Sequence, residues 1–229
     1  MITTENKIVI RYEDGSYGKA YDIVEDFQNG FAIVILDYKK GIINEKGEEV
    51  IPPKYAYIED LTNGFFSVTL NHKQGVFTEK GEEIVSPKYD DIWIFKNGLA
   101  SVKLDGKWGL INKKGEEIVS PKYGGIIDDF KNGLASVNLD GKCGLINEKG
   151  EEVVTPKYDH IYAFDNGFAS IKLDGKWGHI NEKGEEVVTP KYDHIYAFDN
   201  GFAKVLFNGK WGVINKKGEE VIPPVMTED

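Results

Sequence analysis

The chain has 229 residues and a net charge of −10, with 28 basic and 38 acidic residues. This acidic balance excludes nucleic acid as an expected partner, because affinity for phosphates needs a basic surface. No signal-peptide pattern opens the chain, no apolar run approaches the length of a membrane span, and a single cysteine excludes an intramolecular disulfide, so we expect a cytoplasmic chain without a membrane partner.

The dipeptide Asn-Gly recurs along nearly the whole chain, at Asn29, Asn63, Asn97, Asn132, Asn166 and Asn200. Successive copies are 34, 34, 35, 34 and 34 residues apart. A period of about 20 to 50 residues indicates copies of one supersecondary unit stacked on each other. The single 35-residue step predicts an extra residue, and a bulge, near Gly124 and Gly125.

The repeat defines the expected domain organisation. We predict one repeat domain over residues 1–229. Within it, residues 1–18 are expected to form an N-terminal capping strand, residues 19–224 the repeats, and residues 225–229 an acidic tail.

Each Asn-Gly is followed by six residues in which alternate positions are apolar, as at Ala100, Val102 and Leu104. Alternation with a period of two predicts a half-buried β-strand. Asp105 and Gly106 then supply the two residues with positive φ that a tight hairpin turn requires. The chain is therefore expected to reverse into a second antiparallel strand.

The second strand carries a Lys-Trp-Gly motif in half of the copies. The Trp position holds, in chain order, Lys40, Gln74, Trp108, Cys143, Trp177 and Trp211. A fully buried position would not accept Lys or Gln without a large desolvation cost, so we predict a row that is at most partly buried. We interpret Cys143 as a small apolar member of this row, because the sequence places no base beside it.

A Lys-Gly turn, a pair of glutamates, two β-branched residues and a proline come next. Proline cannot donate to a strand ladder, so we expect a short third strand that ends at the proline or lies at a sheet edge. The return segment, with Tyr158, Ile161 and Phe164 spaced by three, predicts a turn or bulge before a short fourth strand. We interpret the glutamate pairs, such as Glu116 and Glu117, as scaffold, since neighbours on a strand point to opposite faces.

The residues 105–123, Asp-Gly-Lys-Trp-Gly-Leu-Ile-Asn-Lys-Lys-Gly-Glu-Glu-Ile-Val-Ser-Pro-Lys-Tyr, resemble the repeat of bacterial WG or KWG β-repeat proteins. The similarity extends over about nine tenths of the chain. It implies an all-β tandem array without a shared catalytic site, for which binding or scaffolding is the usual expectation. The copies with Lys40, Gln74 and Cys143 depart from the Trp-Gly motif.

The expected fold class is all-β, with six tandem antiparallel β-meanders in an open, solenoid-like array. A six-bladed β-propeller is the alternative, because the half repeats at the two ends of the chain would complete one blade. The strand-like residues 7–12, which a ring does not need, favour the open array.

No set of residues in the sequence predicts a catalytic or metal site. His160 and His194 are equivalent positions one repeat apart, and His179 lies between them, but no Cys or further His stands at ligand spacing. A Ser-His-Asp order and a glycine-rich phosphate loop are both missing from the sequence. We expect neither an enzyme, nor a metal, nor a cofactor.

Aromatic residues in variable positions are the candidates for binding. Stacked copies are expected to align Trp93, Tyr162 and Tyr196 along one surface, and Trp108, Trp177 and Trp211 along another. Exposed aromatic rows are typical of surfaces that bind proteins or sugars. The first hypothesis is a non-enzymatic scaffold for a protein or peptide partner; a glycan-binding module and a purely structural spacer are the alternatives. Rings that merely cover gaps between units are the structural interpretation of the same rows.

Overall fold

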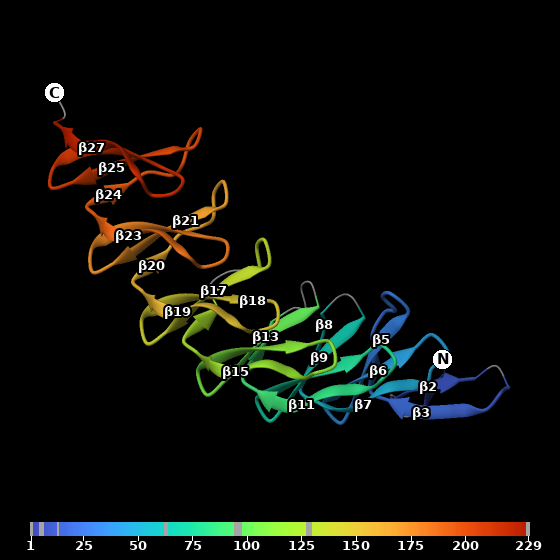
Figure 1. The fold of residues 1–229 in the computed structure, drawn as a ribbon. Coiled ribbons are helices and arrows are strands. Elements are labelled where there is room, and N and C mark those ends of the chain that lie inside the picture. The colour runs from blue at the N-terminus through green and yellow to red at the C-terminus, as the bar shows by residue number, and fades with distance from the viewer. Residues whose placement is uncertain are drawn as a thin grey trace. The chain divides into compact units, whose positions relative to one another are not determined.

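The structure is a computed structural model that describes residues 2–4, 7–12, 14–61, 64–93, 98–126 and 130–227. In these ranges all elements of regular secondary structure are β-strands, and they form seven antiparallel sheets (Figure 1). The described part contains no helix long and apolar enough to cross a membrane. The chain divides into two compact units, residues 1–121 and residues 122–229.

Unit 1 begins with a three-stranded sheet made of β1 (Ile2–Thr4), β2 (Lys7–Arg11) and β3 (Tyr17–Tyr21). Three four-stranded sheets follow; β15, the last strand, crosses the division between the units. Their strands are β4 (Ile23–Val24), β5 (Phe31–Leu36), β6 (Lys39–Asn44), β7 (Glu49–Tyr55), β8 (Tyr57–Asp60), β9 (Phe65–Leu70), β10 (Lys73–Thr78), β11 (Glu83–Tyr89), β12 (Asp91–Ile92), β13 (Leu99–Leu104), β14 (Lys107–Asn112) and β15 (Glu117–Tyr123). The predicted capping strand at residues 1–18 is thus most of a sheet.

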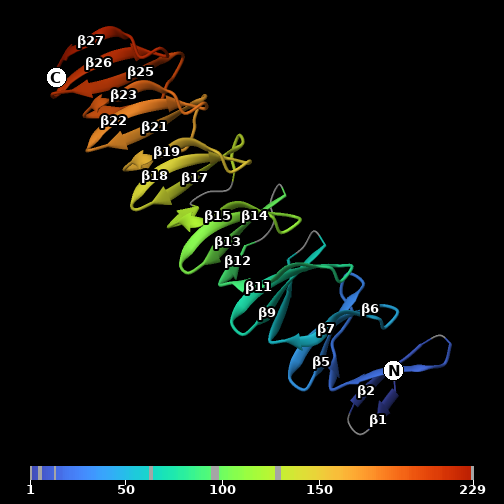
Figure 2. The same ribbon diagram turned by 60° about the horizontal axis from the view of Figure 1, so that its bottom comes forward.

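Unit 2 contains three further four-stranded sheets, which Figure 2 shows from yellow to red. Their strands are β16 (Gly125–Ile126), β17 (Leu134–Leu139), β18 (Lys142–Asn147), β19 (Glu152–Tyr158), β20 (His160–Ile161), β21 (Phe168–Leu173), β22 (Lys176–Asn181), β23 (Glu186–Tyr192), β24 (His194–Ile195), β25 (Phe202–Phe207), β26 (Lys210–Asn215) and β27 (Glu220–Met226).

The predicted all-β array of tandem antiparallel meanders is confirmed. Within each sheet every strand pairs with the next strand along the chain, and no sheet in the described part of the chain closes into a barrel. Within each unit the sheets follow one another in chain order, which is the arrangement of an open array. The short strand after each repeat tyrosine, which has two residues except for the four-residue β8, is the first strand of the next sheet. The assignment of residues 1–229 to a single domain stays a prediction.

The described Asn-Gly dipeptides form two-residue hairpin turns. Asn29 has φ 51° and Gly30 has φ 85°, and the amide and carbonyl groups of Gln28 and Phe31 bond to each other across the turn. Asn132, Asn166 and Asn200 share the positive φ. Asn63 and Asn97 lie outside the described residues.

The first glutamate of five of the six pairs bonds to the asparagine that holds the second type of turn. Asn112 Oδ1 accepts the backbone N–H groups of Lys114 and Glu116 at 2.9 and 3.1 Å, while its Nδ2 donates to Glu116 Oε2. Gly115 supplies the positive φ of 77°. The side chain of asparagine thus replaces backbone partners that the tight turn leaves unpaired.

The proline of each repeat lies in a bulge of an edge strand. In β23 the residues between Val188 and Tyr192 outnumber those between their partners in β22, so the register shifts there. A Cβ on Gly178 would come within 2.3 Å of the carbonyl oxygen of Val188 and 2.9 Å of the nitrogen of Pro190. This close approach explains why every repeat has glycine directly after the Trp position. The edge position is confirmed, but the third strand is not short, because it continues past the proline to the tyrosine.

The core lies between successive sheets. Val188 and Tyr192 of β23 form one buried cluster with Ala203, Val205 and Ile214 of the following sheet. Burial of these apolar side chains is the main stabilising contribution.

The second glutamate of five of the six pairs joins one sheet to the preceding one. Tyr192 is almost fully buried and donates its hydroxyl to Glu220 Oε1 at 2.9 Å, and Lys191 Nζ lies 3.2 Å from the same oxygen. Equivalent tyrosine–glutamate bonds are Tyr21–Glu49, Tyr89–Glu117, Tyr123–Glu152 and Tyr158–Glu186. Both members of the glutamate pairs therefore serve the scaffold, as the sequence indicates.

The predicted bulge near Gly124 and Gly125 is wrong. The Gly124 N–H donates to the carbonyl of Asn138 at 2.7 Å, as that of Asp159 donates to Lys172 in the next sheet. Gly125 likewise pairs with Asn138 as His160 pairs with Lys172. The extra residue of the 35-residue step instead falls between positions 126 and 130, most of which lie outside the described residues.

Candidate functional site

Aromatic side chains of unit 2 form one continuous line of ring contacts. The rings of Tyr162 and Trp177 are stacked at 5.1 Å, and Trp177 meets His194 edge to face at 5.4 Å. His194 contacts Tyr196 at 4.8 Å, and Tyr196 contacts Trp211 at 5.8 Å. We call these five residues the aromatic ladder. It extends over the two sheets β20–β23 and β24–β27.

The position of Trp177 follows from the pairing of the strands. In the register Trp177 of β22 lies between Lys172 of β21 and Tyr192 of β23. Lys172 Nζ stands 5.3 Å from the centre of the indole ring, a cation–π distance. Tyr162 is held beside β21, because its backbone N–H donates to the carbonyl of Ser170. Trp177 therefore has neighbours on several sides and is half-buried.

The tyrosines of the ladder are the exposed part of this arrangement. Tyr162 is 46% exposed and Tyr196 is 50% exposed. Trp177 and Trp211 are half-buried behind them. The ladder thus presents tyrosine rings to solvent, each in contact with a half-buried indole.

Unit 1 contains one aromatic pair of the same kind. The rings of Trp93 and Trp108 meet at 4.7 Å with an interplanar angle of 64°. Trp93 is 55% exposed, and its Nε1–H donates to Asp91 Oδ2 at 2.9 Å. Lys103 Nζ lies 5.4 Å from the ring of Trp108. The carboxylate and the cation fix the orientation of the two indoles.

The predicted separation of the six aromatic residues into two surfaces is wrong. Trp93, Tyr162 and Tyr196 each contact the indole that was assigned to the other surface. In the sheet β20–β23, for example, the segment after β20 lies along β21, and from there the ring of Tyr162 reaches Trp177 of β22. The prediction that the Trp row is at most partly buried is confirmed for five of its members and wrong for Cys143, which is buried. The contact between Trp177 and His194 of the next sheet shows that the indoles also cover a junction between sheets.

His194 belongs to the ladder, although it was not among the candidate binding residues. Its counterpart His160 lies 6.1 Å from Tyr162, ring centre to ring centre. The signal that could have identified them is that each histidine stands two residues before a ladder tyrosine.

The remaining candidate residues serve the interior. His179 is 1% exposed, its Nε2 lies 3.1 Å from Ser170 Oγ, and its ring packs against Phe198. Burial lowers the pKa of His179 to about 4. Cys143 is buried, with its Sγ 3.6 Å from the carbonyl oxygen of Asp159. The described residues contain no group of three or more His, Cys, Asp or Glu side chains arranged to hold a metal.

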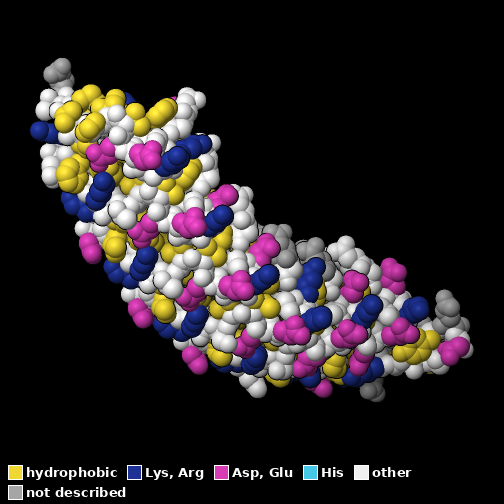
Figure 3. All heavy atoms as spheres, viewed as in Figure 1, with side chains coloured by type: hydrophobic (Ala, Val, Ile, Leu, Met, Phe, Trp, Pro, Cys, Tyr) yellow, Lys and Arg dark blue, Asp and Glu magenta, His cyan; other side chains and the backbone are white. Residues whose placement is uncertain are grey.

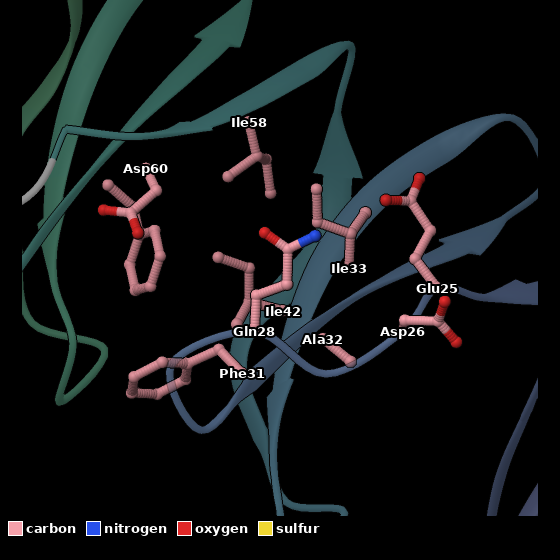
Figure 4. A pocket seen from close by; sticks show the side chains of 10 residues that line it. Glu25, Asp26, Gln28, Phe31, Ala32, Ile33, Ile42, Ile58 and Asp60 are labelled. Atoms are coloured by element: carbon pink, nitrogen blue, oxygen red, sulfur yellow. The ribbon is translucent and has the colours of Figure 1, made fainter.

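Unit 1 has a small pocket of about 110 Å³ between the sheets β4–β7 and β8–β11 (Figure 4). Apolar side chains, including those of Phe31, Ile42 and Ile58, line it together with the carboxylates of Glu25, Asp26 and Asp60. A typical small-molecule site is about three times larger or more. The pocket is therefore a gap in the packing of two sheets and is less suited to a ligand than the aromatic ladder.

The family model for WG-containing repeats matches six successive stretches, residues 41–73, 75–108, 108–143, 144–177, 177–211 and 211–225. A comparison with curated proteins finds no match.

Solved structures with a similar chain course include Hsv2p of Kluyveromyces lactis, at 13% identity, a TM-score of 0.35 and coverage of 84% of this chain and 74% of the other. PorZ of Porphyromonas gingivalis is similar at 12% identity and a TM-score of 0.31, over 92% of this chain and 37% of the other. At these TM-scores the likeness carries no argument about this chain.

Proposed function

The chain belongs to the family of WG-containing repeats, and we propose that it is a non-enzymatic scaffold that binds a protein or peptide partner. The contact surface is the aromatic ladder of unit 2, with the Trp93–Trp108 pair of unit 1 as a second, smaller site. The observation that carries the proposal is the unbroken series of ring contacts from Tyr162 to Trp211, in which the tyrosines remain about half exposed.

Aromatic side chains that are already fixed suit this role. Tyr and Trp offer a large contact area, and each loses little conformational entropy on binding. In the ladder Tyr162 stacks on Trp177, so its orientation is largely set before a partner arrives. A peptide laid across the sheets would cover Tyr162 and Tyr196 in succession, and hydrogen bonds to their hydroxyls would set its direction.

The arrangement of the polar residues supports a non-enzymatic role. Glu186 and Glu220, the second members of their pairs, accept hydrogen bonds from the repeat tyrosines, and Glu185 and Glu219, the first members, bond to turn asparagines. The carboxylates are thus engaged in the scaffold. An acid–base pair would need two titratable groups that face one substrate position.

Selection of peptides from a random display library on the full chain tests the proposal. The selected peptides should bind the double variant Tyr162→Ala/Tyr196→Ala at least about tenfold more weakly, since exposed aromatic side chains dominate such interfaces. Tyr57→Ala is the matched control, because Tyr57 is 69% exposed in unit 1 and makes none of the ring contacts of the ladder.

Tryptophan fluorescence gives an independent measurement, because Trp177 and Trp211 lie directly behind the exposed tyrosines. A selected peptide should change the emission, and the double variant should abolish the change. If polysaccharides change the emission and no peptide is selected, the surface binds glycans and the proposal is refuted. Equal binding of peptides to the double variant would also refute it.

A further inference from the structure

The exposure of the ladder tyrosines is a property of the repeat. Tyr162, which is followed by the sheet β24–β27, is 46% exposed, and Tyr196 of that later sheet is 50% exposed. Trp93 of unit 1 stands at the same position of its repeat and is 55% exposed. A following sheet thus hardly changes the exposure of this ring, and a ligand can reach it inside an array.

Successive ladder tyrosines are separated by the step from one sheet to the next. The sheets β20–β23 and β24–β27 pack face to face through one buried cluster, and sheets packed in this way lie about 10 Å apart. Between Tyr162 and Tyr196 the rings of Trp177 and His194 form an unbroken series of contacts. A polyproline II helix rises about 3.1 Å per residue and turns once in three residues, so one turn advances about 9 Å. One turn of such a helix therefore matches one step of the array.

The ladder also offers hydrogen-bond donors that the protein does not use. Among the described residues, the hydroxyls of Tyr162 and Tyr196 and the indole N–H groups of Trp177 and Trp211 donate to no protein acceptor. A polyproline II helix has no internal hydrogen bonds, so its backbone carbonyls are free to accept from such donors. The ladder can thus bind the backbone of this kind of peptide as well as its side chains.

The ring planes of the ladder differ in orientation. Trp177 and His194 meet at 74°, and His194 and Tyr196 meet at 89°, so ring faces alternate with ring edges. A row of sugar rings would stack on aromatic rings that lie in parallel planes. The small pyrrolidine ring of proline instead packs between aromatic rings of different orientation, as in other aromatic surfaces that bind proline-rich segments. The geometry therefore favours a proline-rich peptide over a polysaccharide.

Two lysines place positive charge beside the ladder. Lys172 Nζ lies 5.3 Å from the ring centre of Trp177. The backbone carbonyl of Lys204 accepts the N–H of Tyr196, so Lys204 is a direct neighbour of that tyrosine across the strands. Within the described part of the chain neither lysine forms an ion pair. Both are available to a carboxylate of a ligand.

The acidic residues around the ladder are paired or lie further away. Asp159 and Asp193, which directly precede β20 and β24, each lie 2.6 Å from the Nζ atom of a lysine. Asp165 and Asp199 belong to the Asn-Gly turns before β21 and β25. Figure 3 shows acidic and basic side chains lying next to one another on one face of the molecule. The unpaired charge beside the ladder is therefore positive and complements an acidic ligand.

One kind of ligand satisfies all of these features of the ladder. We propose, as an extension of the scaffold function proposed above, that the ladder binds an acidic, proline-rich peptide in the polyproline II conformation. Each turn of the helix spans one sheet, so prolines three residues apart contact Tyr162 and Tyr196 in succession. Acidic side chains between the prolines pair with Lys172 and Lys204, and the hydroxyl and indole groups donate to the peptide carbonyls.

Fluorescence anisotropy of a labelled peptide of about four Pro-Pro-Glu repeats, titrated with the full chain, tests the proposal. We expect saturable binding. The mirror-image peptide of D-residues has the same composition and charge but the opposite helical hand, and it should bind at least about tenfold more weakly. A peptide of about one repeat spans a single sheet and should also bind at least about tenfold more weakly.

Variants of the chain locate the bound peptide. Tyr162→Ala and Tyr196→Ala should each weaken binding by at least about tenfold. Lys204→Glu should weaken it by at least about fivefold, and more at low salt than at high salt. Lys183→Glu is the matched control, because it makes the same change of charge at an exposed lysine in a turn. It should leave the affinity at physiological salt unchanged.

Thermal melts followed by circular dichroism establish that each variant is folded. If a tyrosine variant unfolds, the mirror-image and short peptides decide the question, because they are measured on the wild-type chain. Equal affinity for the two mirror images overturns the proposal, and so does a wild-type chain that fails to bind the long peptide at about 200 µM.

Peptide selection on the full chain separates this proposal from the scaffold function. Selected peptides that depend on Tyr162 and Tyr196 and carry prolines at a spacing of three residues support both. Selected peptides that depend on these tyrosines but lack such prolines leave the scaffold function intact and refute the polyproline ligand. Binding of polysaccharides without any peptide refutes both.

Discussion

Replacement of His179 by leucine should make the fold less sensitive to acid. His179 is buried at a position where the third and fourth repeats have Leu110 and Leu145. Its Nδ1 has no hydrogen-bond partner in the described structure, and burial lowers its pKa to about 4. Leucine fits the same core and carries no ionisable group, so His179→Leu isolates the effect of the buried imidazole.

The magnitude follows from linkage between protonation and folding. The unfolded chain takes up the proton near pH 6.5, whereas the folded chain does so only near pH 4. Stability is therefore lost as the pH falls from 6.5 to 4 and changes no further below that. A pKa lowered by about 2.5, at about 1.4 kcal/mol per pH unit, corresponds to about 3 kcal/mol. His179→Leu should retain this free energy at acid pH.

Urea unfolding at several pH values between 7 and 4 measures the difference between variant and wild type. Loss of stability through protonated carboxylates is common to both and cancels in the difference. Leu145→His provides the reciprocal control, because Leu145 is 2% exposed at the equivalent position of the preceding sheet. It should create an acid-dependent loss of similar size. Parallel pH profiles for His179→Leu and wild type would show that the reasoning from burial is wrong.

Three further predictions concern the scaffold. Tyr158→Phe removes the hydroxyl that bonds to Glu186 and should lower the free energy of unfolding in urea by about 1 to 3 kcal/mol, whereas Tyr55→Phe should be nearly neutral, because the buried Tyr55 hydroxyl has no hydrogen-bond partner in the described structure. Tyr38→Gly should stabilise by about 0.5 to 1 kcal/mol, since Tyr38 has φ 62° in a hairpin turn and is 96% exposed; an unchanged or lower melting temperature would contradict this. Gly109→Ala should destabilise by about 3 kcal/mol in the same urea assay, because its Cβ would come within 2.4 Å of the carbonyl oxygen of Val119.

The sequence predicted the strands and turns because these depend on local chemistry. Asn-Gly and Asp-Gly take positive φ at low cost, so they identify hairpin turns wherever they recur. Alternation of apolar residues, as at Ala169 and Ile171, identifies the half-buried strands between them. The extra residue of the 35-residue step was placed wrongly. The spacing between two successive Asn-Gly turns shows that a residue has been added, but it does not show where in the segment that residue lies.

The sequence pointed to the tyrosines and tryptophans of the candidate site but gave no indication of their contacts. Trp93, Tyr162 and Tyr196 occupy variable positions, which indicated their exposure. Their contact with the indoles depends on how the segment that carries each of them lies across its sheet, which is a tertiary feature. His194 was missed as a ring of the ladder for the same reason.

By itself, the sequence determined that this protein is a tandem array of β-meanders, because a 34-residue period of turn and strand signals repeats through the chain and each signal acts within a few residues. Only the tertiary structure decided which surfaces meet. Glutamates that look alike in sequence separate into one that holds its own turn and one that accepts a hydrogen bond from the sheet before it. The same Val and Ile residues are buried in inner sheets and exposed in the last, because their burial depends on a neighbouring sheet and not on their own repeat.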